Sequence, residues 1–388
     1  MRIAIANPTT WPYVRRGAER FINELAAYLA ARGHEVTVVS GKPGRTEVIP
    51  GNGYTTVCHR RWWHPALAKA GLLEFHMFFF PCLVHLLRER FDAVVCLTFM
   101  DAFAALVSRR FTGAPCIFVV NGIPPRKPYF RSLTLKGAVF GRAIRGADAI
   151  VAISEFVRGY LEQRWGRRCE RLPIPLDADQ FTPRRPAPDT PEIILCAAAL
   201  VDRRKGGRPL MAAFNLLKRR RPQVLLQIAY ALPESLRAEL LALVEEPWRK
   251  DVLFTPADRG LADLFAAATI SVLPSIWEPF GMVVLESMAA GTPVAATRDG
   301  ALPELVSDPN VGCLFDPGPE RDAELTNIEG MARAMEDCLD LAARPETARR
   351  CREHALRYAW REIGPRYERL IQSLVDARSD TPAEVERV

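Results

Sequence analysis

The segment Leu273–Thr297, LPSIWEPFGMVVLESMAAGTPVAAT, indicates a strand, a turn and a helix in succession. It continues the apolar run Ile270–Leu273, which predicts a buried strand. Pro279 stands where the first position of a helix tolerates proline, and Gly291 is typical of a helix end. The unpaired N–H groups of residues 280–283 would then form a helix N-terminus, which attracts phosphate.

Short apolar runs recur along the chain and alternate with amphipathic stretches of helical length. This alternation is typical of parallel sheets covered by helices on both faces. It predicts an α/β protein with two Rossmann-like, doubly wound domains that face a central crevice, where the ends of the strands hold the ligand. The predicted strands are Ile3–Ala6, Val36–Val39, Ala93–Leu97, Cys116–Val120, Ile150–Ile153, Ile193–Ala198, Val224–Ala229, Val252–Thr255, Ile270–Leu273 and Val294–Ala296.

A proline-rich stretch, TPRRPAPDTPE, follows Phe181 and favours an extended linker over a helix. The chain has 388 residues, which at roughly 150 residues per domain also indicates two domains. We therefore place an N-terminal domain at 1–183 and a C-terminal domain at 184–358. Residues 359–388 are expected to form a helix that packs back toward the N-terminal domain, followed by a polar tail.

The charge is distributed unevenly between the two predicted domains. Residues 1–183 hold 25 Lys and Arg against 14 Asp and Glu, whereas the remainder holds 27 against 31. Between Asp101 and Asp148 there is no acidic residue. This excess indicates an anionic partner for the first domain. A nucleic-acid-binding protein is the alternative from another class, but the chain lacks an aromatic RNA platform, a zinc module and a recognition helix, so we expect no nucleic acid.

The cysteines and the apolar segments indicate in which cellular compartment the protein is found. Nine scattered cysteines without a CxxC pair fit a reducing compartment, and the N-terminus lacks the pattern of a signal peptide. The apolar stretch Ala66–Leu87 is interrupted by charged residues, histidines and a proline, so it is not expected to cross a membrane. A cytoplasmic protein is predicted.

The residues from Glu278 to Glu286, followed by SMAAGTPV, resemble the E-x7-E signature of retaining glycosyltransferases of family 4. These enzymes have the GT-B fold, which consists of two Rossmann-like domains. Further resemblance lies at Arg16–Ser40, Leu172–Pro183, Asp299–Val306, Val311–Gly318 and the pair Tyr358 and Trp360. The resemblance extends along most of the chain.

The resemblance implies a role for each part of the signature. Glu278 would hydrogen-bond the hydroxyls of the donor sugar, and Glu286 would hold the ribose hydroxyls. The structural alternative is a buried helix whose two carboxylates only cap or pair with arginines. The backbone that would meet the sugar and the phosphates belongs to Phe280, Gly281, Met282 and Val283.

A second group of residues, AALVDRRKGG, follows the first predicted strand of the second domain. The cations Arg203, Arg204 and Lys205, followed by two glycines, suit a loop that neutralises a diphosphate leaving group. The family has Gly-Arg where this chain has Ala198-Ala199, so the role of that arginine falls to Arg203 or Arg204. The alternative is a solvated basic loop.

The first domain departs from the family pattern at two positions. Arg16 and Gly17 stand where relatives have two glycines that let the donor approach the backbone, and Asn121 stands where many relatives have histidine. Asparagine cannot act as a base at neutral pH, so a general-base histidine is not supported. Ser154 would line the acceptor side or cap a helix. Further candidates for the acceptor side are Arg126, Lys127 and Arg131.

Together these features predict a retaining glycosyltransferase that moves a sugar from a UDP- or GDP-linked donor to an acceptor hydroxyl. The acceptor is expected to be a lipid-linked, cell-envelope or exopolysaccharide glycan, and the enzyme to bind peripherally to the inner face of the membrane. The histidines form no metal signature, so no metal or other cofactor is expected. The alternatives are a GT-B-fold epimerase or phosphorylase, or a non-catalytic sugar-nucleotide-binding relative.

Overall fold

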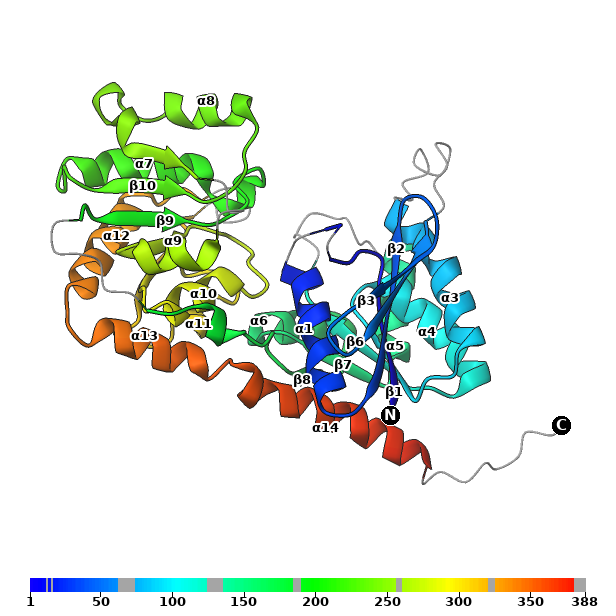
Figure 1. Cartoon of the computed structure of the whole chain (residues 1–388). Helices are drawn as coiled ribbons and strands as arrows, with labels where there is room; N and C mark the ends of the chain where they lie inside the picture. Colours follow the sequence, from blue (N-terminus) through cyan, green and yellow to red (C-terminus); the bar gives the residue numbers. More distant parts are fainter. Residues whose placement is uncertain are drawn as a thin grey trace. The chain divides into compact units, whose positions relative to one another are not determined.

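The computed structural model describes residues 1–11, 13–14, 17–61, 74–123, 135–183, 190–255, 260–319 and 325–379. The chain divides into two compact units, each built on one β-sheet (Figure 1). Unit 1 comprises Met1–Ile174 and Ile363–Val388, and unit 2 comprises Pro175–Glu362. This agrees with the predicted α/β class and the two Rossmann-like sheets.

The sheet of unit 1 has the order β3-β4-β2-β1-β5-β6-β7-β8. Its neighbouring strands are parallel except for β3, which pairs antiparallel with β4. The β3–β4 hairpin was not predicted, because β3 is largely exposed and lacks an apolar run. The strands are β1 (Arg2–Asn7), β2 (Glu35–Lys42), β3 (Glu47–Pro50), β4 (Thr55–Arg60), β5 (Ala93–Cys96), β6 (Cys116–Val120), β7 (Ala149–Ala152) and β8 (Glu170–Arg171).

The helices of unit 1 pack on this sheet through apolar stripes at helical spacing. In the first of them, Phe21, Ile22, Leu25 and Leu29 are buried. The helices are α1 (Gly17–Ala31), α3 (Phe79–Arg88), α4 (Phe99–Thr112), α5 (Leu135–Gly146) and α6 (Glu155–Trp165), and a 3₁₀ turn, η1 (Glu74–Phe78), precedes α3. No helix in the described part of the chain is long and apolar enough to cross a membrane.

The sheet of unit 2 is entirely parallel and has the order β11-β10-β9-β12-β13-β14. The strand order therefore reverses between β9 and β12, the point at which open α/β sheets bind ligands. All five strands predicted for this half are present. The strands are β9 (Ile193–Cys196), β10 (Leu225–Ile228), β11 (Val252–Phe254), β12 (Ile270–Leu273), β13 (Val294–Thr297) and β14 (Gly312–Phe315).

Helices follow the strands of unit 2 in the alternation that the sequence predicts (Figure 1). Strand β12 and the helix after it are fully or nearly buried, which accounts for the apolar character of this part of the sequence. The helices and 3₁₀ turns are η2 (Ala178–Gln180), η3 (Arg203–Lys205), α7 (Gly207–Lys218), α8 (Glu234–Ala242), η4 (Glu246–Asp251), α9 (Leu261–Ala267), α10 (Met282–Ala289), α11 (Leu302–Leu305), α12 (Ile328–Ala342) and α13 (Thr347–Leu356).

The boundary between the units precedes the proline-rich stretch. The sequence places it at Pro183, whereas unit 1 ends at Ile174. The reason is that the chain after Ile174 is hydrogen-bonded within unit 2: the N–H of Leu176 donates to the carbonyl of Tyr358, and its own carbonyl accepts from the N–H of Trp360. Prolines indicate an extended segment, but not the domain on which that segment packs.

Helix α14 (Trp360–Ser379) begins in unit 2 and belongs to unit 1 from Ile363 onward. The hydroxyl of Tyr367 is buried and donates to the carbonyl of Leu172, 3.0 Å away. The carboxylate of Glu368 contacts the guanidinium of Arg32 and the ring of His34, each at 3.0 Å. These contacts attach the last described helix to the sheet of unit 1.

Candidate functional site

The loops that follow β9 and β12 lie against each other at the point where the strand order reverses. The N–H of Ile276 donates to the carbonyl of Arg204, with a distance of 2.9 Å. Gly206 has a φ of 68°, and a Cβ at this position would overlap the carbonyl oxygen of Pro274. Only glycine allows this close approach. The two predicted groups of residues are thus brought together within unit 2.

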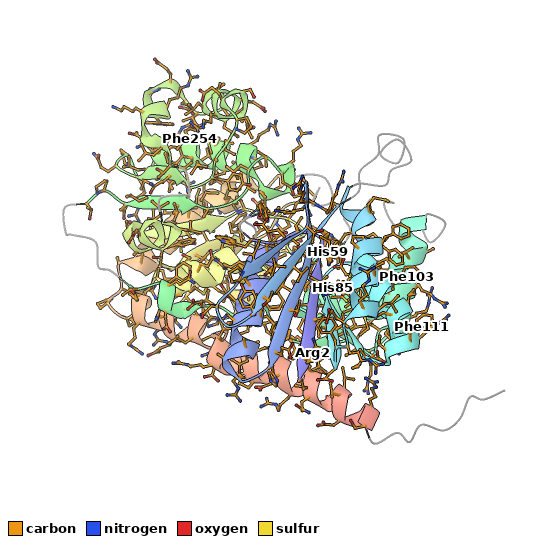
Figure 2. All side chains as sticks on the ribbon, turned by 45° about the vertical axis from the view of Figure 1, so that its right-hand side comes forward. Arg2, His59, His85, Phe103, Phe111 and Phe254 are labelled. Atoms are coloured by element: carbon orange, nitrogen blue, oxygen red, sulfur yellow. The ribbon has the colours of Figure 1, made fainter. Side chains whose placement is uncertain are left out.

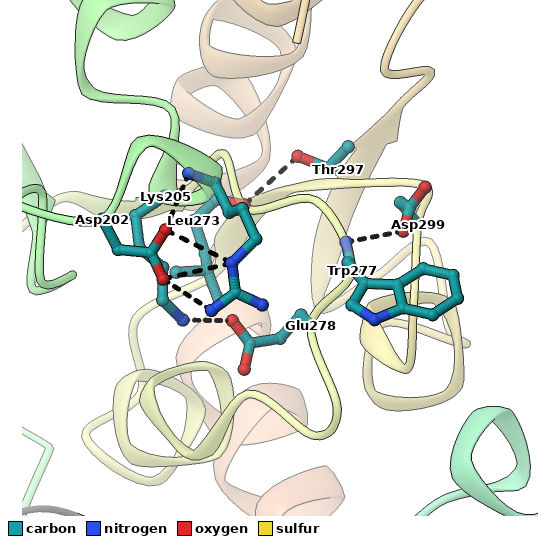
Figure 3. A network of polar contacts seen from close by, with 8 residues as sticks. Asp202, Lys205, Leu273, Trp277, Glu278, Thr297 and Asp299 are labelled. Atoms are coloured by element: carbon teal, nitrogen blue, oxygen red, sulfur yellow. Dashed lines mark hydrogen bonds and ion pairs between the residues drawn. The ribbon is translucent and has the colours of Figure 1, made fainter. Parts of the chain in front are cut away.

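At this contact, Lys205 forms an ion pair with Glu278 (Figure 3). The Nζ of Lys205 lies 2.5 Å from the Oε2 of Glu278, and the two side chains are 25% and 11% exposed. The sequence predicts both residues as parts of the site, but not their pairing. An ammonium has three donors, so Lys205 can keep this contact and still donate to an anion.

The neighbouring arginines differ from each other. The carboxylate of Asp202 accepts from the N–H of Arg204 at 3.0 Å and from its guanidinium Nη2 at 2.6 Å. Burial alone would raise the pKa of Asp202, but the hydrogen bonds from Arg204 and the charge of Lys205 lower it overall. Arg203 is exposed and pairs with no residue in the described part of the chain. Of the two candidates for an anion-binding arginine, Arg203 therefore has the available guanidinium.

A strained residue precedes Glu278. Trp277 has a φ of 57°, a conformation that L residues rarely adopt, and its N–H donates to the Oδ1 of Asp299 at 2.8 Å (Figure 3). The carbonyl of Glu278 accepts from the N–H of Ala301 at 2.9 Å, and Gly300 leaves no room for a Cβ beside the backbone of Glu278. The loop after β13 therefore fixes the position of Glu278.

Helix α10 begins later than the sequence predicts. The prediction that Pro279 is its first residue is wrong: the helix starts at Met282, because Gly281 has a φ of 100° and interrupts the helical conformation. Val283 lies in the first turn with Met282, where N–H groups lack helical acceptors. The predicted end is confirmed, since the helix stops at Ala289 and Gly291 has a φ of 81°.

The remaining signature residues are buried. Glu286 lies within α10 and is 3% exposed. Phe280 is 4% exposed, and its ring packs against that of Tyr358 with centroids 6.3 Å apart. The backbone of Phe280, rather than its side chain, is therefore the part that could meet a ligand.

The candidates in unit 1 follow its strands. Gly17 begins α1 and is exposed, with nothing near the position of a Cβ, and Asn121 follows β6 and is partly exposed. Ser154 caps α6: its hydroxyl accepts from the N–H of Val157 at 3.1 Å, and the residue is 1% exposed. The other candidates lie outside the described residues: Arg16, Arg126, Lys127 and Arg131.

A buried polar group after β1 was not predicted. The amide Nδ2 of Asn7 lies 3.2 Å from the hydroxyl oxygen of Thr9, and this hydroxyl donates to the Oε1 of Glu19 at 2.7 Å. Glu19 is 4% exposed, and its Oε2 has no hydrogen-bond partner among the described residues. The signal in the sequence is the position of Asn7 and Thr9 at the end of the first strand, with Glu19 in the first turn of the helix that follows.

Two histidines that the sequence leaves apart lie together in unit 1. The Nε2 of His59 in β4 lies 3.1 Å from the Nδ1 of His85 in α3 (Figure 2). Burial, with a further contribution from His59, lowers the pKa of His85 to about 4, so its ring is neutral at pH 7. In the described ranges, no three His, Cys, Asp or Glu residues are grouped so that they could hold a metal ion.

Comparison with protein families identifies the class. The family described as "Glycosyl transferases group 1" matches residues 177–356, and that described as "Glycosyltransferase Family 4" matches residues 15–180. The chain thus belongs to the family 4 glycosyltransferases and has the GT-B fold.

Individual relatives align with part of the chain. A D-inositol 3-phosphate glycosyltransferase of Paenarthrobacter aurescens is 30% identical over 56% of this chain and 56% of its own length. A GDP-mannose-dependent alpha-(1-6)-phosphatidylinositol monomannoside mannosyltransferase of Mycolicibacterium smegmatis is 31% identical over 60% and 64%. The chain thus spans less than two thirds of the length of either relative.

A solved structure matches nearly the whole chain. Sucrose-phosphate synthase from Thermosynechococcus elongatus superposes with a TM-score of 0.78 and 20% identity, covering 97% of this chain and 99% of that one. At this identity the similarity shows the fold.

Proposed function

We propose that this protein is a retaining glycosyltransferase that moves a sugar from a nucleoside-diphosphate sugar to an acceptor hydroxyl. The observation that carries the proposal is the Lys205–Glu278 pair, which joins a cation and a carboxylate at the reversal of strand order. A nucleotide sugar presents a diphosphate and hydroxyls side by side, so it requires both kinds of group. Membership of family 4 supports the same activity.

Each group has a proposed role toward the donor. Lys205 and Arg203 would neutralise the diphosphate, together with the amides of Met282 and Val283 at the start of α10. Glu278 would accept hydrogen bonds from the sugar hydroxyls, and Glu286 from the ribose hydroxyls. Asp202 and Asp299 act indirectly, because they hold the loops that carry Arg204 and Glu278.

The proposed chemistry is a front-face displacement without a protein nucleophile. The bond between the sugar and the phosphate breaks, and the acceptor hydroxyl attacks on the same face while its proton passes to the departing phosphate. Catalysis then consists of positioning and of stabilising the leaving group. We propose that cationic side chains and helix amides carry this stabilisation without a metal ion. Asn121 would contribute hydrogen bonds and not base catalysis.

The acceptor is proposed to be lipid-linked or another envelope glycan, with the enzyme at the cytoplasmic face of the membrane. Helix α3 supports this: Phe80, Val84 and Leu87 are 57%, 44% and 41% exposed and lie on one face at spacings of four and three. One relative is named for a phosphatidylinositol-based acceptor, which is consistent with it. Co-sedimentation with phosphatidylglycerol vesicles, lost in Phe80→Ser/Leu87→Ser, tests the proposed membrane contact.

Donor binding is tested by thermal unfolding in the presence of UDP- and GDP-sugars and the free nucleotides. We expect a rise in Tm with one nucleotide family, lost in Glu286→Ala. The matched control is Glu234→Ala in α8, whose carboxylate side chain is 87% exposed. If no nucleotide raises the Tm of the wild type, or if both variants respond alike, the proposed donor site is wrong.

The reaction is tested with the donor found in this way. Proton NMR of the anomeric centre reports the configuration of the product, and we expect it to match that of the donor. Product formation that continues in the presence of EDTA would support metal independence. Epimerised donor without any acceptor would instead favour the epimerase alternative, and donor binding without turnover would favour the non-catalytic one.

A further inference from the structure

Unit 1 contains a basic hollow between the helices α4, α5 and α6. Its volume is about 450 Å³. Five arginines line it: Arg109 and Arg110 from α4, Arg142 and Arg145 from α5, and Arg164 from α6. No acidic residue is among the lining residues described. An arginine-lined hollow of this size matches the volume and charge of a small polyanion.

The hollow exists because α5 presents small residues on this face. Gly137, Ala138 and Gly141 line it at helical spacing. A Cβ on Gly141 would lie 3.3 Å from the guanidinium Nη2 of Arg145 and 3.3 Å from the indole Nε1 of Trp165. The arginine and the indole N–H therefore lie close to the floor, where both can donate to one anion.

Most of the guanidinium groups have no partner within the protein. Arg109 pairs with Asp148, its Nη1 lying 2.6 Å from the carboxylate. The other four make no hydrogen bond or ion pair with any residue that the structure describes: Arg110, Arg142, Arg145 and Arg164. Like charges gathered without counterions repel each other, and an anion in the hollow would remove this repulsion.

The hollow lies near the amino ends of the strands of unit 1, whereas the candidate residues of the same unit follow the carboxyl ends of its strands. Arg109, Arg145 and Arg164 stand in the last turns of α4, α5 and α6. A helix that follows a parallel strand ends near the amino ends of the strands, whereas Asn121 follows the carboxyl end of β6. The hollow is thus separate from the proposed acceptor side of the same unit.

We propose that this hollow binds a ligand bearing two or more phosphate groups. Guanidinium groups bind phosphate oxygens in a bidentate way, and four unpaired ones exceed what a single phosphate requires. A soluble diphosphate and the headgroup of a lipid that carries two phosphates, such as diphosphatidylglycerol, share this chemistry. Phe111, next to Arg110 on α4, is 77% exposed and points away from the protein, where it could reach a lipid surface (Figure 2).

The test is isothermal titration calorimetry with inorganic pyrophosphate, in parallel with co-sedimentation with vesicles that contain diphosphatidylglycerol. All proteins carry Lys205→Ala, so that the proposed donor site contributes little, and Phe80→Ser/Leu87→Ser, so that the exposed face of α3 does not bind the vesicles. We expect Arg142→Gln/Arg145→Gln to weaken binding about tenfold or more, as the loss of two charge-assisted contacts requires. The matched control, Arg45→Gln/Arg60→Gln, removes two exposed arginines of the same unit and should bind like the parent.

A second variant tests the space in the hollow independently of its charge. Ala138→Phe keeps every arginine but fills the space, and Ala138 is exposed, so the fold should tolerate it. If both Arg142→Gln/Arg145→Gln and Ala138→Phe lose binding to pyrophosphate, a soluble ligand is supported. If both lose binding to the vesicles and the parent does not bind pyrophosphate, a lipid headgroup is supported. Absence of binding to either probe, equal loss in the control, or full binding by folded Ala138→Phe would overturn the proposal.

Discussion

The carboxylate of Asp299 holds the backbone of Trp277, accepting its N–H at 2.8 Å (Figure 3). The two residues come from loops after adjacent strands, β12 and β13. Trp277 has a φ of 57°, a conformation that costs an L residue about 1–2 kcal/mol. The hydrogen bond offsets part of this cost. By holding Trp277 in this conformation, it fixes the backbone from which the side chain of Glu278 extends.

We expect Asp299→Ala to lower the free energy of unfolding by about 1–2 kcal/mol, because a hydrogen bond to a charged acceptor is lost. It should also weaken donor binding, since Glu278 loses its support. The matched control is Asp308→Ala, which removes a carboxylate bonded to the N–H of Asn310 at 2.8 Å elsewhere in unit 2. Urea unfolding and donor titration measure both effects. Equal loss of donor affinity in the two variants would contradict the role of Asp299.

Lys205→Met should reduce kcat about 10²–10³-fold, the usual effect of removing one group that stabilises developing negative charge. It also leaves the 11%-exposed carboxylate of Glu278 without its cation. Lys250→Met, which removes an exposed lysine at the end of η4, is the control. Steady-state kinetics with the identified donor provide the measurement. A Lys205→Met enzyme as active as this control would exclude Lys205 from the catalytic machinery.

Gly206→Ala should destabilise unit 2 by about 1–3 kcal/mol and separate the loops after β9 and β12. The cost has two parts: the positive φ of 68° and the overlap of a Cβ with Pro274. Gly166→Ala is the comparison, because Gly166 has a φ of 63° but open space around a Cβ. It should cost only about 1 kcal/mol. Thermal unfolding that shows the same Tm for both variants would mean that the close approach does not matter.

Asp101→Asn should change how stability depends on pH. Burial raises the pKa of Asp101 to about 7, although hydrogen bonds at Thr98 act in the opposite direction. Between its ordinary value of 3.8 and about 7, the folded state holds a proton that the unfolded chain has lost, so the free energy of unfolding falls as pH rises. Asparagine does not titrate there. The stability of Asp101→Asn relative to the wild type should increase from about pH 5 to about pH 8. Parallel urea-unfolding profiles would disprove the shift.

Much of the fold could be predicted because buried parallel strands are apolar runs. Ile270–Leu273 and Cys116–Val120, for example, match β12 and β6 closely. The β3–β4 hairpin could not be predicted this way, because Val48 is 63% exposed and follows no apolar run. The start of α10 was also missed, because Gly281 has a φ of 100°, and the side chain of Leu302, in the loop and helix after β13, occupies the space that a Cβ at this position would need.

The components of the candidate site were predictable, but their pairings were not. Lys205 and Glu278 could each be assigned from the residue types near a strand end. Their contact depends on the reversal of strand order, which joins β9 to β12. The support by Asp299 likewise requires knowing that β13 lies beside β12. Sequence periodicity reveals strands, whereas the order of strands in a sheet is a tertiary property.

Helix α14 determines the order in which the chain can fold during synthesis. Unit 2 is one continuous segment, so the ribosome delivers all of it before Tyr367 and Glu368 emerge. Unit 1 begins first but lacks Tyr367 and Glu368, which contact Leu172, Arg32 and His34, until α14 has been synthesised after unit 2. Unit 1 therefore cannot complete its packing against α14 until after unit 2 has been synthesised. A chain that stops before residue 363 would leave the α14-binding surface of unit 1 exposed.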